Sequence, residues 1–301
     1  MTDIFLWGTG AEGIAERVEP DQLKEMALGR GLESNDPLWR PVSLISEGPE
    51  SRCRVAAKKS RQSVFVTGPC SSSMNLAWYF HRQNLLSEWD SVLVSRQWTG
   101  RGQLGREWVS PAGNIYGTLR LPASAVSEAD CLPVLVGYAL IAALKRIGVN
   151  AKLKWPNDLV LNSKKVGGIL IEDKGGVKMV GVGINLTSSP PGDALRSRNA
   201  LPAACLKDFG HDDLTPLFLW QYLVNTGREF FNKIRMADLP ELLAGLTPHL
   251  AFAGSPVWVE DFVTPPYEAR LLGVSSDGGL QLLTSCGTTV VRSASIYPLD
   301  V

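Results

Sequence analysis

The chain has 301 residues, a length that predicts roughly two domains of ordinary size. Hydrophobic residues make up 45% and charged residues 20%, which is typical of a globular protein. The 30 Lys and Arg side chains balance the 30 Asp and Glu side chains, which argues against a general nucleic-acid or membrane-surface binder, since such proteins normally carry a basic excess.

The longest uncharged, mainly apolar run, 131–144, is too short to cross a bilayer and predicts a buried helix. The N-terminus has Asp3 and no cationic stretch before an apolar core, so no secretory signal is expected. The five cysteines form no C-x-x-C pair and there are only three histidines, so neither a zinc site nor a disulfide framework is predicted. This pattern indicates a reduced, cytoplasmic protein.

The first sixty residues carry weak signals. A strand is predicted at 3–7 and the start of a helix at 14–18. The glycines at positions 8, 10 and 13, between these two elements, match the G-x-G-x-x-G spacing of a dinucleotide-binding turn. A plain turn is favoured, because a dinucleotide fold needs several more βα units. Residues 48–61 are polar and basic, which predicts an exposed linker.

From residue 63 the pattern predicts alternating strands and helices. Serines at 71–73 cap a helix that runs to about residue 86, and a second helix spans 127–147 with a capping-box-like start and Gly148 at its end. A helix with proline at its first position runs from 215 to about 234. Strands are expected at 64–66, 91–95, 115–121, 151–154, 159–161, 168–172 and 179–186. After residue 250, β runs at 256–260, 267–274, 280–284 and 288–293 predict a compact all-β module.

Residues 72–75 and two longer segments, 97–108 and 154–168, contain side chains suited to chemistry. Residues 97–113 are loop-like and include a second G-x-G-x-x-G at 100–105, but no helix follows it to hold a pyrophosphate. Its glycines, interleaved with Arg101 and Arg106, fit an anion-binding loop or an exposed basic hairpin, and both stay open. In the segment 154–168, Lys165 precedes two glycines that allow close backbone approach to a ligand, although a lone lysine there also fits an ordinary surface turn.

Taken together, five ordered motifs resemble those of the biotin–protein ligases. They are Ser72-Ser73-Met74, the loop Gln97–Trp108, Lys154-Trp-Pro-Asn157-Asp158, the run Lys165–Glu172 and Gly181–Asn185. The likeness covers about 64–186 and 250–299. It implies an α+β fold, with a mixed β-sheet packed with helices as in class II synthetase-like biotin/lipoate ligases, plus a C-terminal SH3-like β-barrel. The implied domains are an N-terminal extension at 1–60, a catalytic domain at 61–246 and the SH3-like domain at 247–301.

The resemblance implies a two-step ligation. Biotin would attack the α-phosphate of ATP to give biotinyl-AMP, and a lysine of a biotin carboxyl carrier protein, from acetyl-CoA carboxylase or a related carboxylase, would then take the acyl group. Two anions must meet, so cations are needed where charge builds up. Lys165, Arg101 and Arg106 are the expected catalytic residues. Mg²⁺ would accompany ATP, and no side chains are singled out as its ligands.

The same resemblance implies the remaining site residues. The biotin-binding set is Ser72, Ser73, Met74, Gln97, Gly100, Arg101, Gly102, Gln103, Lys165, Gly167 and Gly168. The ATP and adenylate set is Arg106, Trp108, Lys154, Asn157, Asp158 and Asn185. The chain departs from the family at Gln103, where an arginine is usual, so weaker retention of biotinyl-AMP is expected, by on the order of 1.5–3 kcal/mol for a charged hydrogen bond. Ser73 replaces the usual threonine but keeps the hydroxyl.

Three alternative functions compete with biotin ligation. A lipoate or octanoate ligase shares the fold, but Gln97, the serine pair and the C-terminal module favour biotin. A biotin-responsive DNA-binding regulator is not favoured, since 1–60 lack a convincing pair of short helices with a basic recognition helix. A degenerate biotin-binding paralogue is argued against by the retained cationic set. Family members often dimerise by sheet edges, so a homodimer is a further expectation, whereas DNA and membrane partners are not expected.

Overall fold

The computed structural model describes residues 3–6, 15–16, 40–42, 51–54, 62–125, 131–190, 201–234, 238–261 and 263–299. The chain forms two compact units. The first contains Met1–Ala125, Gly167–Pro190 and Ala204–Asn225, and the second contains Val126–Val166, Pro191–Ala203 and Thr226–Val301. No described helix is long and apolar enough to cross a membrane.

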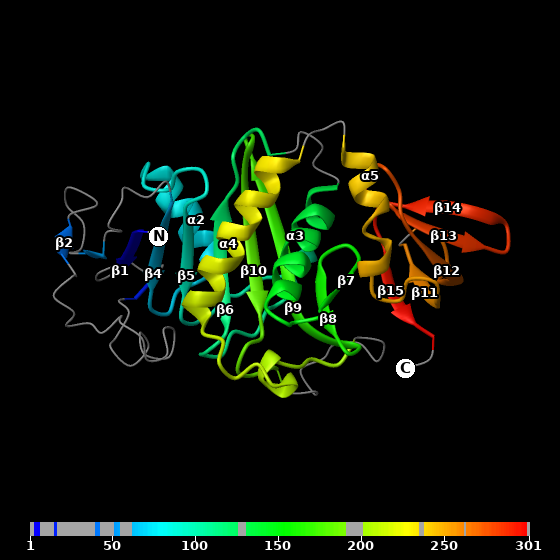
Figure 1. Cartoon of the computed structure of the whole chain (residues 1–301), viewed down its shortest axis with the longest axis horizontal. Helices are drawn as coiled ribbons and strands as arrows, with labels where there is room; N and C mark the ends of the chain where they lie inside the picture. Colours follow the sequence, from blue (N-terminus) through cyan, green and yellow to red (C-terminus); the bar gives the residue numbers. More distant parts are fainter. Residues whose placement is uncertain are drawn as a thin grey trace. The chain divides into compact units, whose positions relative to one another are not determined.

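The first unit is built on a mixed sheet (Figure 1). Its strands are β1 (Asp3–Leu6), β2 (Arg40–Val42), β3 (Ser51–Arg54), β4 (Ser63–Thr67), β5 (Ser91–Val94), β6 (Ile115–Arg120), β9 (Lys164–Lys174) and β10 (Val177–Ile184). They lie in the order β2-β3-β1-β4-β5-β6-β10-β9. Strand β4 is parallel to β1 and β5, and the other described pairs within this order are antiparallel. Strand β9 begins in the second unit and ends in the first.

Two helices cover opposite faces of this sheet, α2 (Ser73–Arg82) and the first part of α4 (Pro216–Lys233). Thr118 of β6 donates a hydrogen bond to Ser73 of α2 at 2.9 Å. The preceding residue, Gly117, faces α4, because a Cβ there would lie 2.5 Å from the ring of Trp220. Successive residues of a strand point to opposite faces, so these two contacts place the helices on the two sides of β6.

The second unit contains a helix, a hairpin and a small sheet. Helix α3 (Leu132–Arg146) packs on strands β7 (Lys152–Lys154) and β8 (Asp158–Leu161), where Gly137 leaves room for Leu153. Helix α5 (Leu239–Ala244) precedes an antiparallel sheet of β11 (Pro256–Glu260), β12 (Tyr267–Val274), β13 (Leu280–Thr284), β14 (Gly287–Val291) and β15 (Ser295–Pro298). Its order is β14-β13-β12-β11-β15, and no closed barrel is found among the described residues.

Most of the predicted elements are confirmed, with two corrections. Residues 48–61 are not simply a linker, because Ser51–Arg54 form β3 between β1 and β2. Ala15 and Glu16 are not helical, since Ala15 pairs with Cys70 and Glu16 exchanges backbone hydrogen bonds with the chain at 68–69. The predicted dinucleotide turn at 8–13 and the predicted start of a helix at 127–130 lie outside the described residues. Helix α5 and strand β15 were not predicted.

Candidate active site

The N-terminal end of α2 joins the serine pair to Gln97. Ser72 is the N-cap, and its hydroxyl accepts the N–H of Asn75 at 3.1 Å, as Ser at this position is expected to do. The N–H of Ser73 donates to Oε1 of Gln97 at 2.7 Å, and the Ser73 hydroxyl accepts from Thr118. Both serines and Thr118 are buried. The predicted biotin-binding residues Ser72 and Ser73 are therefore consecutive buried residues at the start of α2, and the half-buried Gln97 is bonded to Ser73.

The glycine-rich loop folds back over these residues. The side-chain amide of Gln97 donates to Ser110 at 2.9 Å. A Cβ at Gly100 would lie 2.4 Å from the carbonyl oxygen of Trp108, so only glycine fits there. Arg101 donates from Nη2 to Oδ1 of Asn75 at 2.6 Å, which joins the loop to α2. Sequence reasoning named Gly100 and Arg101, but it missed the partners Asn75 and Ser110.

The tip of the loop is exposed. Gln103–Gly105 form a short 3₁₀ turn, and the N–H of Gly102 donates to the carbonyl of Arg106 at 2.7 Å. The backbone is extended at Arg106, and no helix follows within the described loop, so this G-x-G-x-x-G does not form a dinucleotide fingerprint, as predicted. Arg101, Gln103 and Arg106 are all exposed. The loop thus presents two guanidinium groups to solvent, in keeping with an anion-binding role.

Trp108 lies on the glycine stretch of β10. A Cβ at Gly183 would be 2.7 Å from two atoms of the Trp108 indole, so this glycine makes room for the ring. In the sheet register, Gly183 stands opposite Gly168 of β9. The indole ring of Trp108 therefore packs directly on the backbone of β10 at Gly183, because this residue has no side chain. A flat aromatic surface of this kind suits a nucleobase.

Two further predicted residues have structural contacts in the first unit. Met74 is buried in the core cluster, and its Cε would meet a Cβ at Gly181 at 3.1 Å. Asn185 is buried and donates from Nδ2 to the carbonyl of Ala204 at 3.1 Å. Its Oδ1 has no hydrogen-bond partner among the described residues, and an unpaired buried acceptor of this kind is costly. The carboxamide oxygen of Asn185 is suited to accepting an N–H from a ligand.

The second unit brings three predicted residues into one ion-pair cluster, Lys154–Asp158–Lys165. Lys154 ends β7 and stands opposite Asp158, which begins β8, across the Trp155–Asn157 turn. Lys165 is the second residue after the turn Asn162-Ser163, whose members both have positive φ, the backbone that suits a tight hairpin. One carboxylate oxygen of Asp158 lies 2.6 Å from Nζ of Lys165, and the other lies 3.3 Å from Nζ of Lys154.

Charge and burial fit this cluster to an anionic ligand. Burial alone would raise the pKa of Asp158, but the two lysine ammonium groups hold this pKa below its usual range. The carboxylate is therefore ionised at neutral pH, and one net positive charge remains on the cluster. The side chain of Lys165 is 33% exposed, against 14% for Lys154, so Lys165 presents that charge outward. Asn157, in the turn between Lys154 and Asp158, is half-buried.

The structure thus brings Lys154, Asp158 and Lys165 together in the second unit and Ser73 and Gln97 together in the first, whereas no hydrogen bond among the described residues joins Asn185 to Ser73 or Gln97. Lys165 and the Gly167-Gly168 pair lie along the same strand, β9. The described residues contain no group of three or more His, Cys, Asp and Glu side chains placed to hold a metal ion. Both oxygens of Asp158 are engaged by lysines, so this carboxylate does not fit a magnesium ligand.

Comparison with known proteins agrees with this geometry. The biotin/lipoate A/B protein ligase family matches residues 67–188, which hold every motif segment described above. The biotin--[acetyl-CoA-carboxylase] ligase of Paracoccus denitrificans is 35% identical over 224 residues, covering 68% of this chain and 89% of that protein. The chain belongs to the biotin/lipoate A/B protein ligase family.

Other family members match a smaller part of the sequence or the fold alone. The bifunctional ligase/repressor BirA of Escherichia coli K12 is 35% identical over 113 residues, or 34% of each chain. The biotin protein ligase from Aquifex aeolicus, solved in complex with biotin and ATP, superposes with a TM-score of 0.68 at 24% identity. That match covers 78% of this chain and 98% of the Aquifex chain, so the two proteins share a fold.

Proposed function

We propose that this protein is an ATP-dependent biotin–protein ligase, which activates biotin as biotinyl-AMP and transfers the acyl group to a lysine of a carrier protein. The observation that supports it most directly is the Lys154–Asp158–Lys165 cluster, a partly buried cationic site within the residues that match the family. The related Paracoccus protein is named for the same ligation. The ligation unites two anions, and a fixed ammonium group is the chemical feature that such a union requires.

The first step forms a mixed anhydride. A biotin carboxylate oxygen bonds to the α-phosphorus of ATP, and the bond from that phosphorus to the bridging oxygen of the β-phosphate breaks. Pyrophosphate leaves with the electron pair. Lys165, the most exposed member of the cluster, contacts the carboxylate and the α-phosphate oxygens in our proposal, while Asp158 holds its ammonium group in place. Arg101 and Arg106 supply further positive charge from the exposed loop.

The second step moves the acyl group. The neutral amine of the carrier lysine attacks the acyl carbon, AMP leaves, and the amine loses one proton. We propose that the carrier is the biotin carboxyl carrier protein of acetyl-CoA carboxylase or of a related carboxylase. A homodimer and a cytoplasmic location are further proposals. Size-exclusion chromatography with light scattering tests the first, and cell fractionation tests the second.

We assign binding roles to the predicted biotin-binding residues and to the predicted adenylate-binding residues. We assign Ser72, Ser73 and Gln97 to the ureido ring of biotin, because hydroxyl and amide groups pair with its N–H and C=O. Gly167 and Gly168 would flank the acyl tail. We assign Trp108 to the adenine face and the buried Asn185 oxygen to an adenine N–H. Mg²⁺ would arrive as the counter-ion of the ATP phosphates, and no step is assigned to it.

A direct assay separates this function from its alternatives. Purified protein is incubated with ATP, Mg²⁺ and either biotin or lipoate, and the acyl-adenylate is measured for the wild type and for Lys165→Ala. Biotinyl-AMP from the wild type, reduced at least about 100-fold in the variant, is expected if Lys165 stabilises the developing charge. Lipoyl-AMP alone would move the protein to the lipoate ligases. Biotin binding without either adenylate would indicate a degenerate paralogue.

A further inference from the structure

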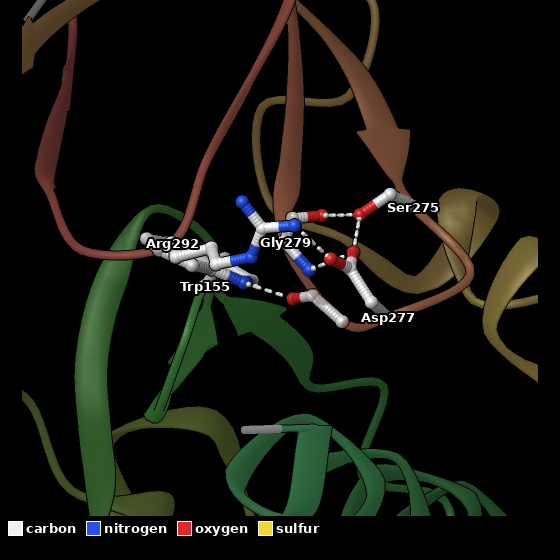
Figure 2. A network of polar contacts seen from close by, with 6 residues as sticks. Trp155, Ser275, Asp277, Gly279 and Arg292 are labelled. Carbon is white, nitrogen blue, oxygen red and sulfur yellow. Dashed lines mark hydrogen bonds and ion pairs between the residues drawn. The ribbon is translucent and has the colours of Figure 1, made fainter. Parts of the chain in front are cut away.

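The turn between β12 and β13 contacts the hairpin that carries the lysine cluster (Figure 2). The indole N–H of Trp155 donates to the carbonyl of Gly278 at 3.0 Å, and Trp155 is almost fully buried. Gly278 has φ of +87°, and a Cβ there would lie 2.7 Å from Cβ of Cys131, the residue before α3. Backbone conformation and space both require glycine, so the carbonyl that receives the indole N–H has a fixed direction.

Asp277 holds this turn in shape. Its carboxylate pairs with Arg292, accepts the hydroxyl of Ser275 and accepts the N–H of Gly279 at 3.3 Å. Backbone hydrogen bonds close the same turn, from Gly278 to Ser275 at 2.9 Å and from Ser275 to Gly279 at 2.8 Å. Figure 2 shows Ser275, Asp277, Gly279 and Arg292 in this network, with Trp155 beside it. The Gly278 carbonyl, which accepts the Trp155 N–H, is therefore held in place by hydrogen bonds and an ion pair within the β12–β13 turn and with Arg292.

The same small sheet contacts the cluster at a second point. Nζ of Lys154 lies 5.9 Å from the ring centroid of Tyr297 in β15, within the range of a cation–π interaction. Trp155 follows Lys154 directly and begins the three-residue turn that leads to Asp158, so two consecutive residues on the Lys154 side contact the small sheet or its turn. Asp158 in turn fixes the ammonium group of Lys165.

We propose that Trp155 is a positioning residue and that the β12–β13 turn is its anchor, so that the C-terminal sheet sets the placement of the Lys154–Asp158–Lys165 cluster. This inference rests on the proposed function. The indole N–H orients the 155–157 turn, the turn orients Asp158, and Asp158 orients Lys165. Because a small misplacement of a catalytic group slows the reaction, a change at the partly exposed Asp277, in a turn of the C-terminal sheet, is expected to slow adenylation.

Asp277→Ala and Trp155→Phe test the proposal against a matched control, Asp261→Ala. Asp261 is likewise a partly exposed aspartate in a turn of the same sheet, where it accepts the N–H groups of Val263 and Thr264 at 3.0 and 2.8 Å. No hydrogen bond between described residues joins Asp261 to the lysine hairpin. Single-turnover formation of biotinyl-AMP is measured well below each variant's unfolding temperature. We expect about tenfold slower formation in Asp277→Ala and Trp155→Phe, and a change within about twofold in Asp261→Ala.

A double-variant cycle separates positioning from simple loss of stability. If Trp155 and Asp277 act through the cluster, adding either substitution to Lys165→Ala slows adenylation no further, because the group being positioned is already gone. Independent, multiplicative effects would overturn the proposal, as would equal rates for the Asp277 and Asp261 variants. No biotinyl-AMP from the wild type would instead overturn the proposed function, and this inference with it.

Discussion

Replacing Gly183 by alanine tests whether the contact between β10 and Trp108 matters for the nucleotide. The new Cβ would lie 2.7 Å from two indole atoms, whereas ordinary contacts begin near 3.4 Å. The ring must therefore move by about 0.7 Å or the strand must bend. Overpacking of this size typically costs about 1–3 kcal/mol. Since we assign the Trp108 face to adenine, we expect the KM for ATP to rise about tenfold, with a smaller change in the KM for biotin.

Gly181→Ala is the matched control, because it adds the same methyl group to the same strand. Its Cβ would meet the terminal methyl of Met74 at 3.1 Å, and a flexible side-chain end moves readily. Adenylation kinetics over a range of ATP concentrations and thermal unfolding are measured for both variants. The reasoning fails if Gly183→Ala matches Gly181→Ala in KM for ATP and in unfolding temperature, since the indole would then have space that the structure denies it.

Three further predictions concern charge. Asp158→Asn should lower the free energy of unfolding at pH 7. Because the lysines depress the pKa of Asp158 in the folded state, the difference in this free energy from wild type should shrink as pH falls below about 4. Urea titrations at several pH values measure it. Asp277→Asn should make the free energy of unfolding fall less steeply between about pH 4 and pH 2. The Ser275 hydrogen bond and Arg292 lower the pKa of Asp277 to about 2, so the wild type loses this contribution as the carboxylate is protonated. The same pH dependence in the variant and the wild type would contradict this. Gln103→Arg should retain biotinyl-AMP longer than wild type on a desalting column, because it restores a charged hydrogen bond, and equal half-lives would exclude a role for Gln103 in leakage.

Sequence patterns predicted the strands and helices that have a clear hydrophobic alternation or a capping residue. Strands β11, β12 and β13 coincide with the predicted spans, because side chains alternate between the core and solvent and glycine-containing turns separate them. Helix α2 begins where its serine cap predicted. By contrast, Ser51–Arg54 is polar and shows no such alternation, so its pairing with β1 and β2 depends on the rest of the sheet. Strand β15 is four residues long and ends in proline, which gives little signal.

The candidate site shows the same division. The resemblance named Lys154, Asp158 and Lys165 separately, and two successive hairpins were needed to show that one carboxylate joins them. Their supporting residues could not be recognised in the same way. Thr118 lies in the middle of β6, and Tyr297 lies 143 positions after the lysine it faces, so no spacing rule connects either residue to the site.

The alternation along β6 also limits how the gene can change. Gly117 leaves the space that Trp220 fills on one face, while Thr118 bonds to the serine pair on the other. Deleting or inserting a single codon within this strand would reverse the two faces, placing a threonine against the tryptophan and removing the hydroxyl from the serines. In a library of single-codon insertions and deletions, β6 should therefore be nearly empty of active clones, whereas the solvent-exposed turn at 175–176 should tolerate them.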